Sequence, residues 1–479
     1  MPQWNNQVAL AAAVAVALTV SLGLTIVLGR TLSPAAFGFV ALIGAVLAMA
    51  RDMTELGSGT VAAARIAATP DCEAAILDQV LGLRLVLAVL ASLGCLALAL
   101  RPERADEQAV LALTAAAVLL LPLGSLAIVF QARHQPLQPV LIGLAAQLAA
   151  AAACIALAVL PGIAAGSAVA VGAAIAALQV LREAATALAV WRAGTRRLGW
   201  WPRPRWVSRE LLREIGGYGL AALCFGLAVQ GSPVLVGLAG PPGALEAYAA
   251  AFRPIVPLLS LPWVVAAPLV PMLVALGAAD RAAASSRAAT LLRVGLGLGA
   301  VVAVAGHDFA GAALATLYGE RAILATGDAV LALKFLAASL AATIMLAPAT
   351  AILLARRRIR HILALGVLCL AGTLAGAVLL LPAWGAAGMA SALAAATAAV
   401  ALLTHIAAIR LSGCANSGWT NWRWPAMLLP AIALALVDRL IPIEGRLVLV
   451  PGAIAFAAAC WAACRLAGAG RQRDVPVPA

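Results

Sequence analysis

Uninterrupted apolar segments of about 18 residues or more recur from one end of this chain to the other. Of its 479 residues, 64% are hydrophobic and only 11% are charged. A segment of this length crosses the hydrocarbon core of a bilayer as a helix, and a helix satisfies every backbone polar group internally. The pattern therefore excludes a soluble globular fold and predicts an all-α polytopic membrane protein.

The apolar segments divide into about fourteen expected transmembrane helices. The segment at 8–29 follows a start without basic residues and is too long for a signal-peptide core, so we expect it to be the first helix. The final pair has only a short separator at 441–446, and the chain can equally be described as twelve spans with two appended helices. The expected helices cover residues 8–29, 36–58, 80–100, 109–131, 140–160, 167–191, 216–238, 246–275, 289–307, 329–354, 361–381, 387–409, 425–441 and 447–464.

The positions of the arginines set the expected orientation, because basic residues stay preferentially on the cytoplasmic side. With both termini in the cytoplasm, most of the 32 basic residues fall on that side, so the net charge of +13 is a consequence of topology. A nucleic-acid partner is not indicated, because the most basic segment is short, is tethered to the membrane at both ends and has no recognition motif. Arginine interleaved with tryptophan is instead typical of an anionic lipid surface. That segment contains Arg192, Arg196, Arg197, Trp200, Trp201, Arg203, Arg205, Trp206, Arg209 and Arg213.

An internal repeat indicates two halves. The segment 160–168 (LPGIAAGSA) recurs at 381–390 (LPAWGAAGMA), and 34–39 has a looser echo at 242–248. Chance similarity between Ala- and Gly-rich segments is the alternative explanation. Two six-helix halves running in the same direction predict a pseudo-two-fold axis along the membrane normal, with a cavity between the halves. The expected organisation is an N-terminal half at 1–191, a cytoplasmic basic linker at 192–215, a C-terminal half at 216–410, and two additional helices with a cytoplasmic tail at 411–479.

Three cations lie inside expected helices of both halves: Arg182, Arg253 and Lys334. A charge at bilayer depth costs several kcal/mol unless it is paired or faces water, so intramembrane charges are functional candidates. These three positions predict a cationic path for an anionic substrate. The alternative is structural: Arg182 can pair with the adjacent Glu183, and long basic side chains near a helix end can extend to the interface.

A second group of charges, Arg51, Asp52 and Glu55, lies near the cytoplasmic end of the second expected helix and just before Gly57. Their depth and the neighbouring glycine predict a gate. Residues three and four apart share a helix face, so pairing within this helix is the alternative.

Residues for catalysis or metal binding are not evident. No nucleophile and base occur together in a sizeable outer segment, so we expect no enzyme. The eight cysteines lie mostly in apolar segments and form no metal-ligand pattern, so neither a metal nor another cofactor is expected. Glutamines within the apolar segments are assigned to helix packing rather than to sugar binding: Gln79, Gln131, Gln147, Gln179 and Gln230.

Four motifs carry a resemblance to a known family. They are residues 28–38 (LGRTLSPAAFG), residues 55–57 followed by Arg65, residues 247–253 (AYAAAFR) and residues 382–388 (PAWGAAG). Their order and spacing resemble polysaccharide-biosynthesis flippases of the multidrug/oligosaccharidyl-lipid/polysaccharide superfamily. The family usually has Asp where this chain has Glu55, a conservative departure.

The resemblance implies a transporter that flips an undecaprenyl-diphosphate-linked oligosaccharide across the bacterial inner membrane by alternating access, for lipopolysaccharide or exopolysaccharide synthesis. It adds Arg30 to Arg182, Arg253 and Lys334 as expected substrate-binding residues. It also implies membrane lipids, a polysaccharide polymerase and glycosyltransferases as partners, and no nucleic acid. A peptidoglycan-precursor flippase, a multidrug antiporter of the same superfamily and a non-transporting scaffold of a polysaccharide-synthesis complex are the alternatives.

Overall fold

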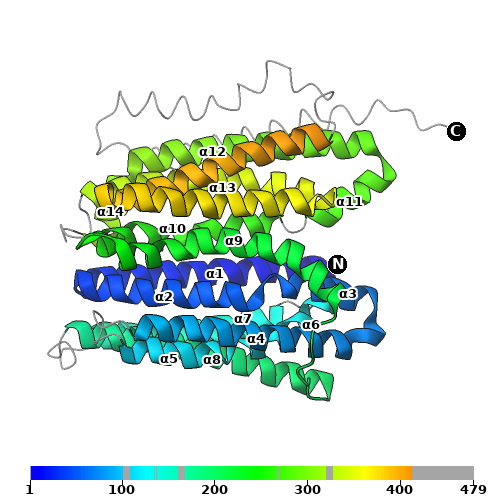
Figure 1. The fold of residues 1–479 in the computed structure, drawn as a ribbon, viewed down its shortest axis with the longest axis horizontal. Coiled ribbons are helices and arrows are strands. Elements are labelled where there is room, and N and C mark those ends of the chain that lie inside the picture. Colours follow the sequence, from blue (N-terminus) through cyan, green and yellow to red (C-terminus); the bar gives the residue numbers. More distant parts are fainter. Residues whose placement is uncertain are drawn as a thin grey trace. The chain divides into compact units, whose positions relative to one another are not determined.

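The computed structural model describes residues 2–100, 108–133, 135, 137–159, 168–266, 269–319 and 327–412. Over these ranges every regular element is helical (Figure 1). Eleven helical segments within them are long and apolar enough to cross a membrane, which confirms the polytopic all-α fold. The expected helices at 425–441 and 447–464 lie outside the described residues.

The N-terminal helices follow the apolar segments closely. Ser33 caps α2, where its hydroxyl oxygen accepts the Ala36 N–H at 3.3 Å and Pro34 occupies the first turn. The elements are α1 (Pro2–Thr31), α2 (Pro34–Glu55), α3 (Ser58–Ala68), the 3₁₀ turn Pro70–Cys72, α4 (Glu73–Ala99), α5 (Gln108–Val118), the 3₁₀ turn Leu121–Leu126, α6 (Ala127–Ala132), α7 (Leu137–Val159) and α8 (Ala168–Leu198).

The later helices are α9 (Arg209–Ala239), α10 (Ala244–Ala266), α11 (Leu269–Ala279), α12 (Arg281–Tyr318), α13 (Gly327–Ala355) and α14 (Ile359–Ser412). Within α14 the backbone of Gly385 has a φ of 52°, and this kink separates the two helices expected at 361–381 and 387–409. The expected single helix at 246–275 corresponds to α10 and to the first part of α11, and residues 267 and 268 between them lie outside the described residues. The α4 helix begins at Glu73 rather than at residue 80, and α8 continues to Leu198, so the non-helical part of the basic segment is only 199–208.

The chain divides into two compact units. The first contains Met1–Pro257, Leu314–Ala332 and Ile362–Leu393, and the second contains Leu258–Ala313, Leu333–His361 and the chain from Ala394 onward.

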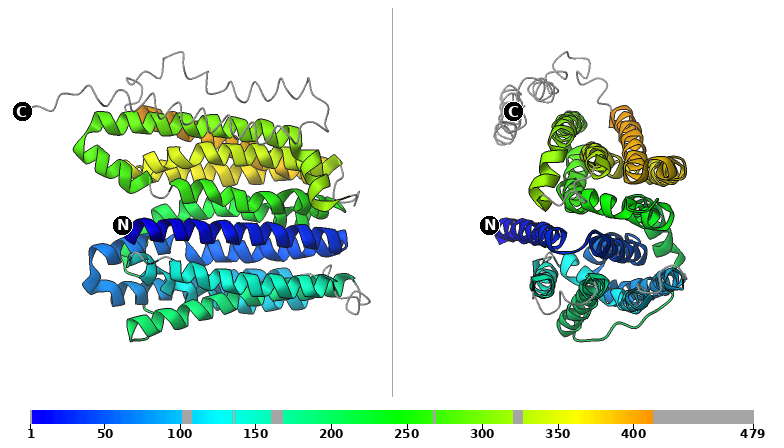
Figure 2. Two further views of the ribbon diagram at one scale, coloured as in Figure 1. Left: turned by 180° about the vertical axis from the view of Figure 1, so that it is seen from behind. Right: turned by 90° about the vertical axis from the view of Figure 1, so that its left-hand side faces the viewer.

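In the first unit α2 is the most enclosed helix. Its side chains Phe37, Val40 and Ile43 are fully buried, and it packs against α4, α8 and α9 (Figures 1 and 2). Helices in a bilayer associate through close packing, which small residues permit. At Gly219 of α9, a Cβ would collide with the Leu56 carbonyl oxygen, so only glycine allows this approach to the end of α2.

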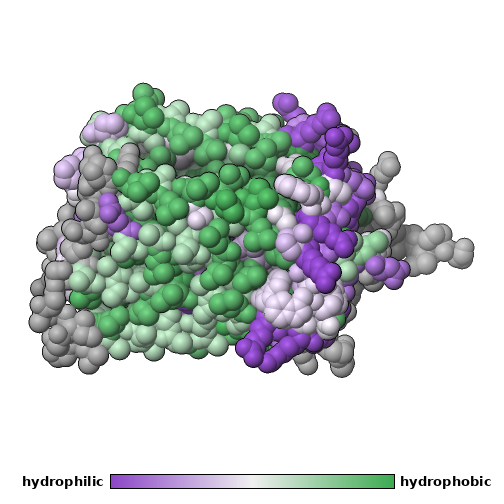
Figure 3. All heavy atoms as spheres, turned by 60° about the horizontal axis from the view of Figure 1, so that its bottom comes forward, coloured by the Kyte–Doolittle hydropathy of each residue, from purple (hydrophilic) through white to green (hydrophobic). Residues whose placement is uncertain are grey.

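One face of the first unit, shown in Figure 3, is apolar along the helices and hydrophilic at one end. This is the end at which α3 lies and α8 terminates. Exposed arginines of α8 and of the segment after it belong to this end: Arg192, Arg196, Arg197, Arg203 and Arg205. An apolar belt bounded by a basic end is the surface that a bilayer requires.

The second unit has its own core. Leu273, Leu292 and Ile352 bring α11, α12 and α13 together. The Thr397 hydroxyl group donates to the Ser339 hydroxyl oxygen at 3.1 Å and links α14 to α13.

Candidate functional site

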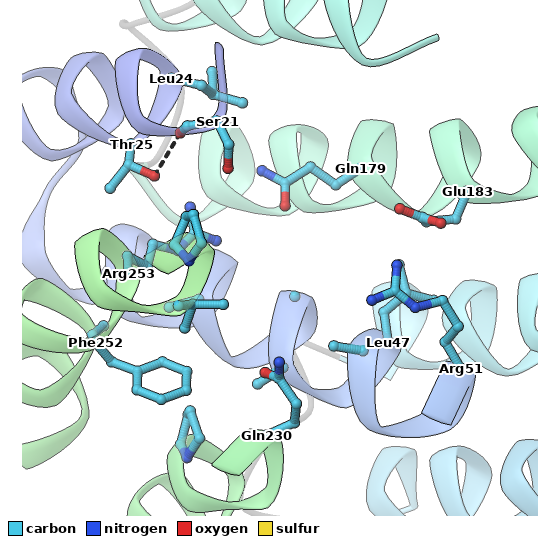
Figure 4. Close-up of a pocket in the computed structure, with 18 of the residues that line it drawn as sticks. Ser21, Leu24, Thr25, Leu47, Arg51, Gln179, Glu183, Gln230, Phe252 and Arg253 are labelled. Carbon is cyan, nitrogen blue, oxygen red and sulfur yellow. Dashed lines mark hydrogen bonds between the residues drawn. The ribbon is translucent and has the colours of Figure 1, made fainter. Parts of the chain in front are cut away.

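A cavity of about 290 Å³ lies within the first unit (Figure 4). Side chains from α1, α2, α7, α8, α9 and α10 line it, together with Leu121. Its volume is near the lower end of the range for small-molecule sites. The polar residues that line it are Ser21, Thr25, Arg51, Gln147, Gln179, Arg182, Glu183, Gln230 and Arg253.

One end of the cavity carries Arg51, Arg182 and Glu183. Arg182 forms an ion pair with Glu183, as the adjacent positions in the sequence predicted. Figure 4 shows the guanidinium group of Arg51 directed from α2 toward the carboxylate of Glu183 on α8, and these two groups attract each other electrostatically. Two cations from different helices therefore face one carboxylate, and Arg182 forms the ion pair with it.

Arg253 on α10 occupies another part of the cavity. Its guanidinium group donates to the Val40 carbonyl oxygen at 2.7 Å and lies 5.5 Å from the centre of the Phe37 ring. A Cβ on Gly44 would lie 3.5 Å from Arg253 Nη2 and 3.9 Å from Gln179 Oε1, so both side chains meet at this glycine. The groups that hold Arg253 are neutral, and its positive charge remains available to a ligand.

The surroundings of Arg253 are themselves fixed by hydrogen bonds. The hydroxyl groups of Tyr248 and Ser232 lie 2.7 Å apart, and the Tyr318 hydroxyl group donates to the Ala250 carbonyl oxygen at 3.0 Å. The Tyr318 ring also meets the Phe37 ring edge to face, at 5.8 Å between centres. A guanidinium group fixed in this way loses little conformational entropy when an anion binds.

The cavity lies deep in the membrane-spanning part of the unit. At 1.5 Å per residue, Arg253 lies about 14 Å along α10 from Ala244, and Arg182 about 21 Å along α8 from Ala168. These depths fall within a hydrocarbon core of about 30 Å. Among the residues that the structure describes, three arginines and one carboxylate line the cavity, so this lining is cationic.

Two of the expected substrate-binding residues lie elsewhere. Arg30 donates to the Leu317 carbonyl oxygen at 2.9 Å and to the Thr316 carbonyl oxygen at 2.6 Å, so it ties the end of α1 to the end of α12. Lys334 is on α13 in the second unit and does not line the cavity. Substrate binding by Arg30 and by Lys334 stays a prediction.

The expected gate residues have separate surroundings. Arg51 lines the cavity, whereas the Asp52 carboxylate lies against Gly226 of α9. Glu55 forms an ion pair with Arg84 of α4 at 3.7 Å, and the buried Arg84 donates through Nε to the Ser58 hydroxyl oxygen at 2.8 Å. A contact between helices therefore holds Glu55. Gating by these residues stays a prediction.

The chain between α2 and α3 bends just beyond Glu55, where Leu56 has a φ of 43° and Gly57 a φ of 64°. A left-handed backbone costs little at glycine but is uncommon for leucine. The network around Glu55 thus lies beside a break in the membrane-spanning helix.

Sequence reasoning missed Arg84 and Asp78. Arg84 is a charge within an apolar segment, the signal that identified Arg182, and Asp78 lies six residues before it. The Asp78 carboxylate accepts the Arg203 N–H at 2.8 Å and its carbonyl oxygen accepts the Arg205 N–H at 3.0 Å. Asp78 therefore fixes the basic segment to α4.

Among the described residues no cluster of three or more His, Cys, Asp or Glu side chains has the arrangement of a metal site. The geometry of the cavity instead suits electrostatic binding of an anion by guanidinium groups.

Comparison with known proteins identifies the family. Residues 4–276, more than half of the chain, match the family model described as polysaccharide biosynthesis protein. No curated protein matches the chain at a significant level.

Among solved structures, a multidrug resistance MATE family transporter in an inward-facing conformation is 16% identical, with a TM-score of 0.58 over 85% of this chain and 99% of that one. The lipid II flippase MurJ, in an inward closed conformation, is 10% identical, with a TM-score of 0.58 over 92% and 99%. A transporter from Pyrococcus furiosus, for which a reversed polarity of the binding pocket was described, is 18% identical, with a TM-score of 0.56 over 85% and 95%.

At these identities the similarity to solved structures is one of fold, and the family match covers the helices that form the cavity. The chain is therefore a member of the polysaccharide biosynthesis protein family, with several membrane-spanning helices and the fold of these solved transporters.

Proposed function

We propose that this protein flips a lipid-linked oligosaccharide, with an undecaprenyl-diphosphate carrier, from the cytoplasmic to the outer leaflet of the bacterial inner membrane. The flipped unit is then polymerised or ligated into a cell-surface polysaccharide. A polysaccharide polymerase and glycosyltransferases are the expected partners of such a transporter.

The observation that carries the proposal is the cationic lining of the cavity, where the described residues include Arg51, Arg182 and Arg253 but only one carboxylate, that of Glu183. A diphosphate is strongly disfavoured in hydrocarbon, so its path requires cations at bilayer depth. Guanidinium groups suit phosphate oxygens because they donate through a planar fork. The cavity volume of about 290 Å³ suits the diphosphate and the adjoining sugar rather than the whole lipid-linked unit.

The same observation argues against a multidrug antiporter for cations. A path for cationic drugs requires carboxylates, whereas Glu183 already forms an ion pair with Arg182 and faces Arg51. The cavity therefore favours anions.

Alternating access supplies the movement in this proposal. In two-lobed transporters one half rocks against the other around a site near the midplane. The bend at Leu56 and Gly57 and the contact of Glu55 with Arg84 are suited to an inner closure, because they couple α2 to α4 beside the cavity.

The test is a flipping assay with the full chain in proteoliposomes that contain a fluorescent lipid-linked substrate. An enzyme or quencher added outside the vesicles acts only on substrate in the outer leaflet, so the loss of the remaining signal over time measures flipping. We expect flipping of a polyprenyl-diphosphate oligosaccharide, and a loss of at least tenfold with Arg182→Ala. If a peptidoglycan precursor were flipped as fast as the polyprenyl-diphosphate oligosaccharide, the protein would also act as a peptidoglycan-precursor flippase. Undiminished polysaccharide export with Arg182→Ala and Arg253→Ala combined would indicate a scaffold and refute the transport path.

The variant Lys334→Ala tests whether the cationic path includes Lys334 or is formed by the residues of the cavity alone. Lys334 belongs to the second unit, so a comparable loss would extend the cationic path to that unit. An unchanged rate would restrict the path to the cavity in the first unit.

A further inference from the structure

The carboxylate of Glu183 stands out in a cavity lined by cations. Among the described residues that line the cavity it is the one acidic group. A carboxylate on an anion path weakens anion binding through repulsion, most strongly where the dielectric constant is low. Its position between Arg182 and Arg51 therefore calls for a role of its own.

The ion pair of Glu183 does not hold two helices together. Arg182 and Glu183 are consecutive residues of α8, so their ion pair connects no two elements, and Arg51 of α2 adds only an electrostatic attraction to Glu183. The ion pair of Arg65 with Glu210, by contrast, joins α3 to α9. Loss of the Glu183 charge should consequently leave the packing of the unit intact.

The two cationic parts of the cavity differ in how their charge is balanced. Arg253 is held by a carbonyl oxygen and an aromatic ring, whereas Arg51 and Arg182 face a carboxylate. Along α2, Gly44, which adjoins Arg253, and Arg51 are about 10 Å apart. Arg182 and Arg253 are also close enough to repel each other. An arriving anion thus meets a cation without a carboxylate at Arg253, and two cations whose charge Glu183 partly offsets at Arg51 and Arg182.

We propose that Glu183 is an exchangeable counter-ion: it pairs with Arg182 and offsets part of the charge that Arg182 and Arg51 carry together when the cavity is empty, and the diphosphate of the substrate displaces it. This inference rests on the proposed function and deepens it. Diphosphate binding begins at Arg253 and spreads toward Arg182 in competition with Glu183. The competition lowers the affinity for the substrate, which lets the substrate leave after it has crossed the membrane.

The experiment uses the full chain in phosphatidylcholine nanodiscs, titrated with farnesyl diphosphate and, separately, with farnesol. With Glu183→Gln we expect about tenfold tighter binding of farnesyl diphosphate, equivalent to about 1.4 kcal/mol. Farnesol binding should not change, because it carries no charge. Glu246→Gln is the matched control, since Glu246 lies in the first turn of α10 and does not line the cavity, and it should leave both affinities unchanged.

A second measurement separates a counter-ion from a passive neighbour. Arg182→Ala leaves the charge of Glu183 facing the ligand, so it should weaken diphosphate binding more than the double variant Arg182→Ala with Glu183→Gln. A double-mutant cycle gives this coupling directly. Melting temperatures of the variants in nanodiscs confirm that each is folded.

Three results would overturn the inference. The first is an affinity for farnesyl diphosphate in Glu183→Gln that is equal to or weaker than that of the unmodified protein, and the second is a cycle without coupling. In both cases a preference for farnesyl diphosphate over farnesol that depends on Arg253 would leave the proposed function standing. The third is the absence of that preference in the unmodified protein, which would overturn the proposed function as well.

Discussion

Arg253 is the residue whose replacement should most reduce binding of a diphosphate lipid. Its guanidinium group faces the cavity while the Val40 carbonyl oxygen and the Phe37 ring hold it in place. A hydrogen bond to a charged group contributes about 1.5 to 3 kcal/mol. At about 1.4 kcal/mol for each factor of ten, Arg253→Ala should weaken binding by about 10- to 150-fold.

The variant Arg253→Lys tests whether charge alone is sufficient. Lysine keeps the charge, but its ammonium group lacks the planar fork that can contact Val40, Phe37 and a phosphate together. We expect its affinity to lie between those of the unmodified protein and Arg253→Ala. Arg133→Ala is the control, because Arg133 pairs with Glu73 at 2.8 Å and does not line the cavity.

The assay is titration of purified protein in nanodiscs with farnesyl diphosphate at two salt concentrations. Salt should weaken the binding by the unmodified protein more than the binding by Arg253→Ala, because the variant has lost one of the attracting charges. If Arg253→Ala bound the diphosphate as tightly as Arg133→Ala, Arg253 would have no part in anion binding and the reasoning from its geometry would be refuted.

The remaining predictions concern topology, gating and packing. A cysteine placed at Arg205 should react with a membrane-impermeant reagent only from the cytoplasmic side, and labelling from the outside would invert the topology. Glu55→Gln should remove about 1 kcal/mol of pairing with Arg84 and shift the equilibrium between the closed and open states of the inner gate about fivefold. We expect slower flipping at an unchanged melting temperature. Failure of the variant to insert into the membrane would show that the ion pair is structural. Gly219→Ala should cost about 1 to 3 kcal/mol because its Cβ would collide with the Leu56 carbonyl oxygen, and an unchanged melting temperature would refute that close approach.

The helices could be predicted from the sequence because the bilayer imposes one length and one composition on every span. The segments at 8–29 and 140–160 correspond to α1 and α7 within a few residues, apart from the early start of α1 at Pro2. Helix ends outside the hydrocarbon have no such signal. The extension of α8 to Leu198 is rich in arginine, and hydropathy alone ended that helix at residue 191.

Part of the site was also predictable, because a charge inside an apolar segment is visible in the sequence. Arg51, Arg182 and Arg253 were identified in this way, and the structure places all three around one cavity. The sequence predicts a gate role for Arg51, because the sequence shows its position along α2 but not which side of that helix faces the cavity.

The glutamines, too, were predictable in part: the sequence indicates a packing role but not which of them face the cavity. Gln147 donates to the Ala17 carbonyl oxygen at 2.9 Å, the packing role that the sequence predicted, and it also lines the cavity. Gln179 and Gln230 line the cavity as well, which composition could not reveal. Which helix faces which is decided by packing between segments far apart in the chain.

The ion pairs of the first unit divide into two physical kinds. Arg84 with Glu55 and Arg65 with Glu210 join different helices, so breaking them removes a link between those helices. Arg182 and Glu183 are neighbours on one helix, so their pair can open without moving any backbone. Charges that must yield to a passing diphosphate are best placed in a pair of the second kind, and charges that hold a closed state in pairs of the first kind. The cavity contains the second kind, and the cross-helix pair of Glu55 lies beside the bend at Leu56, as the prediction of a gate at this position expects.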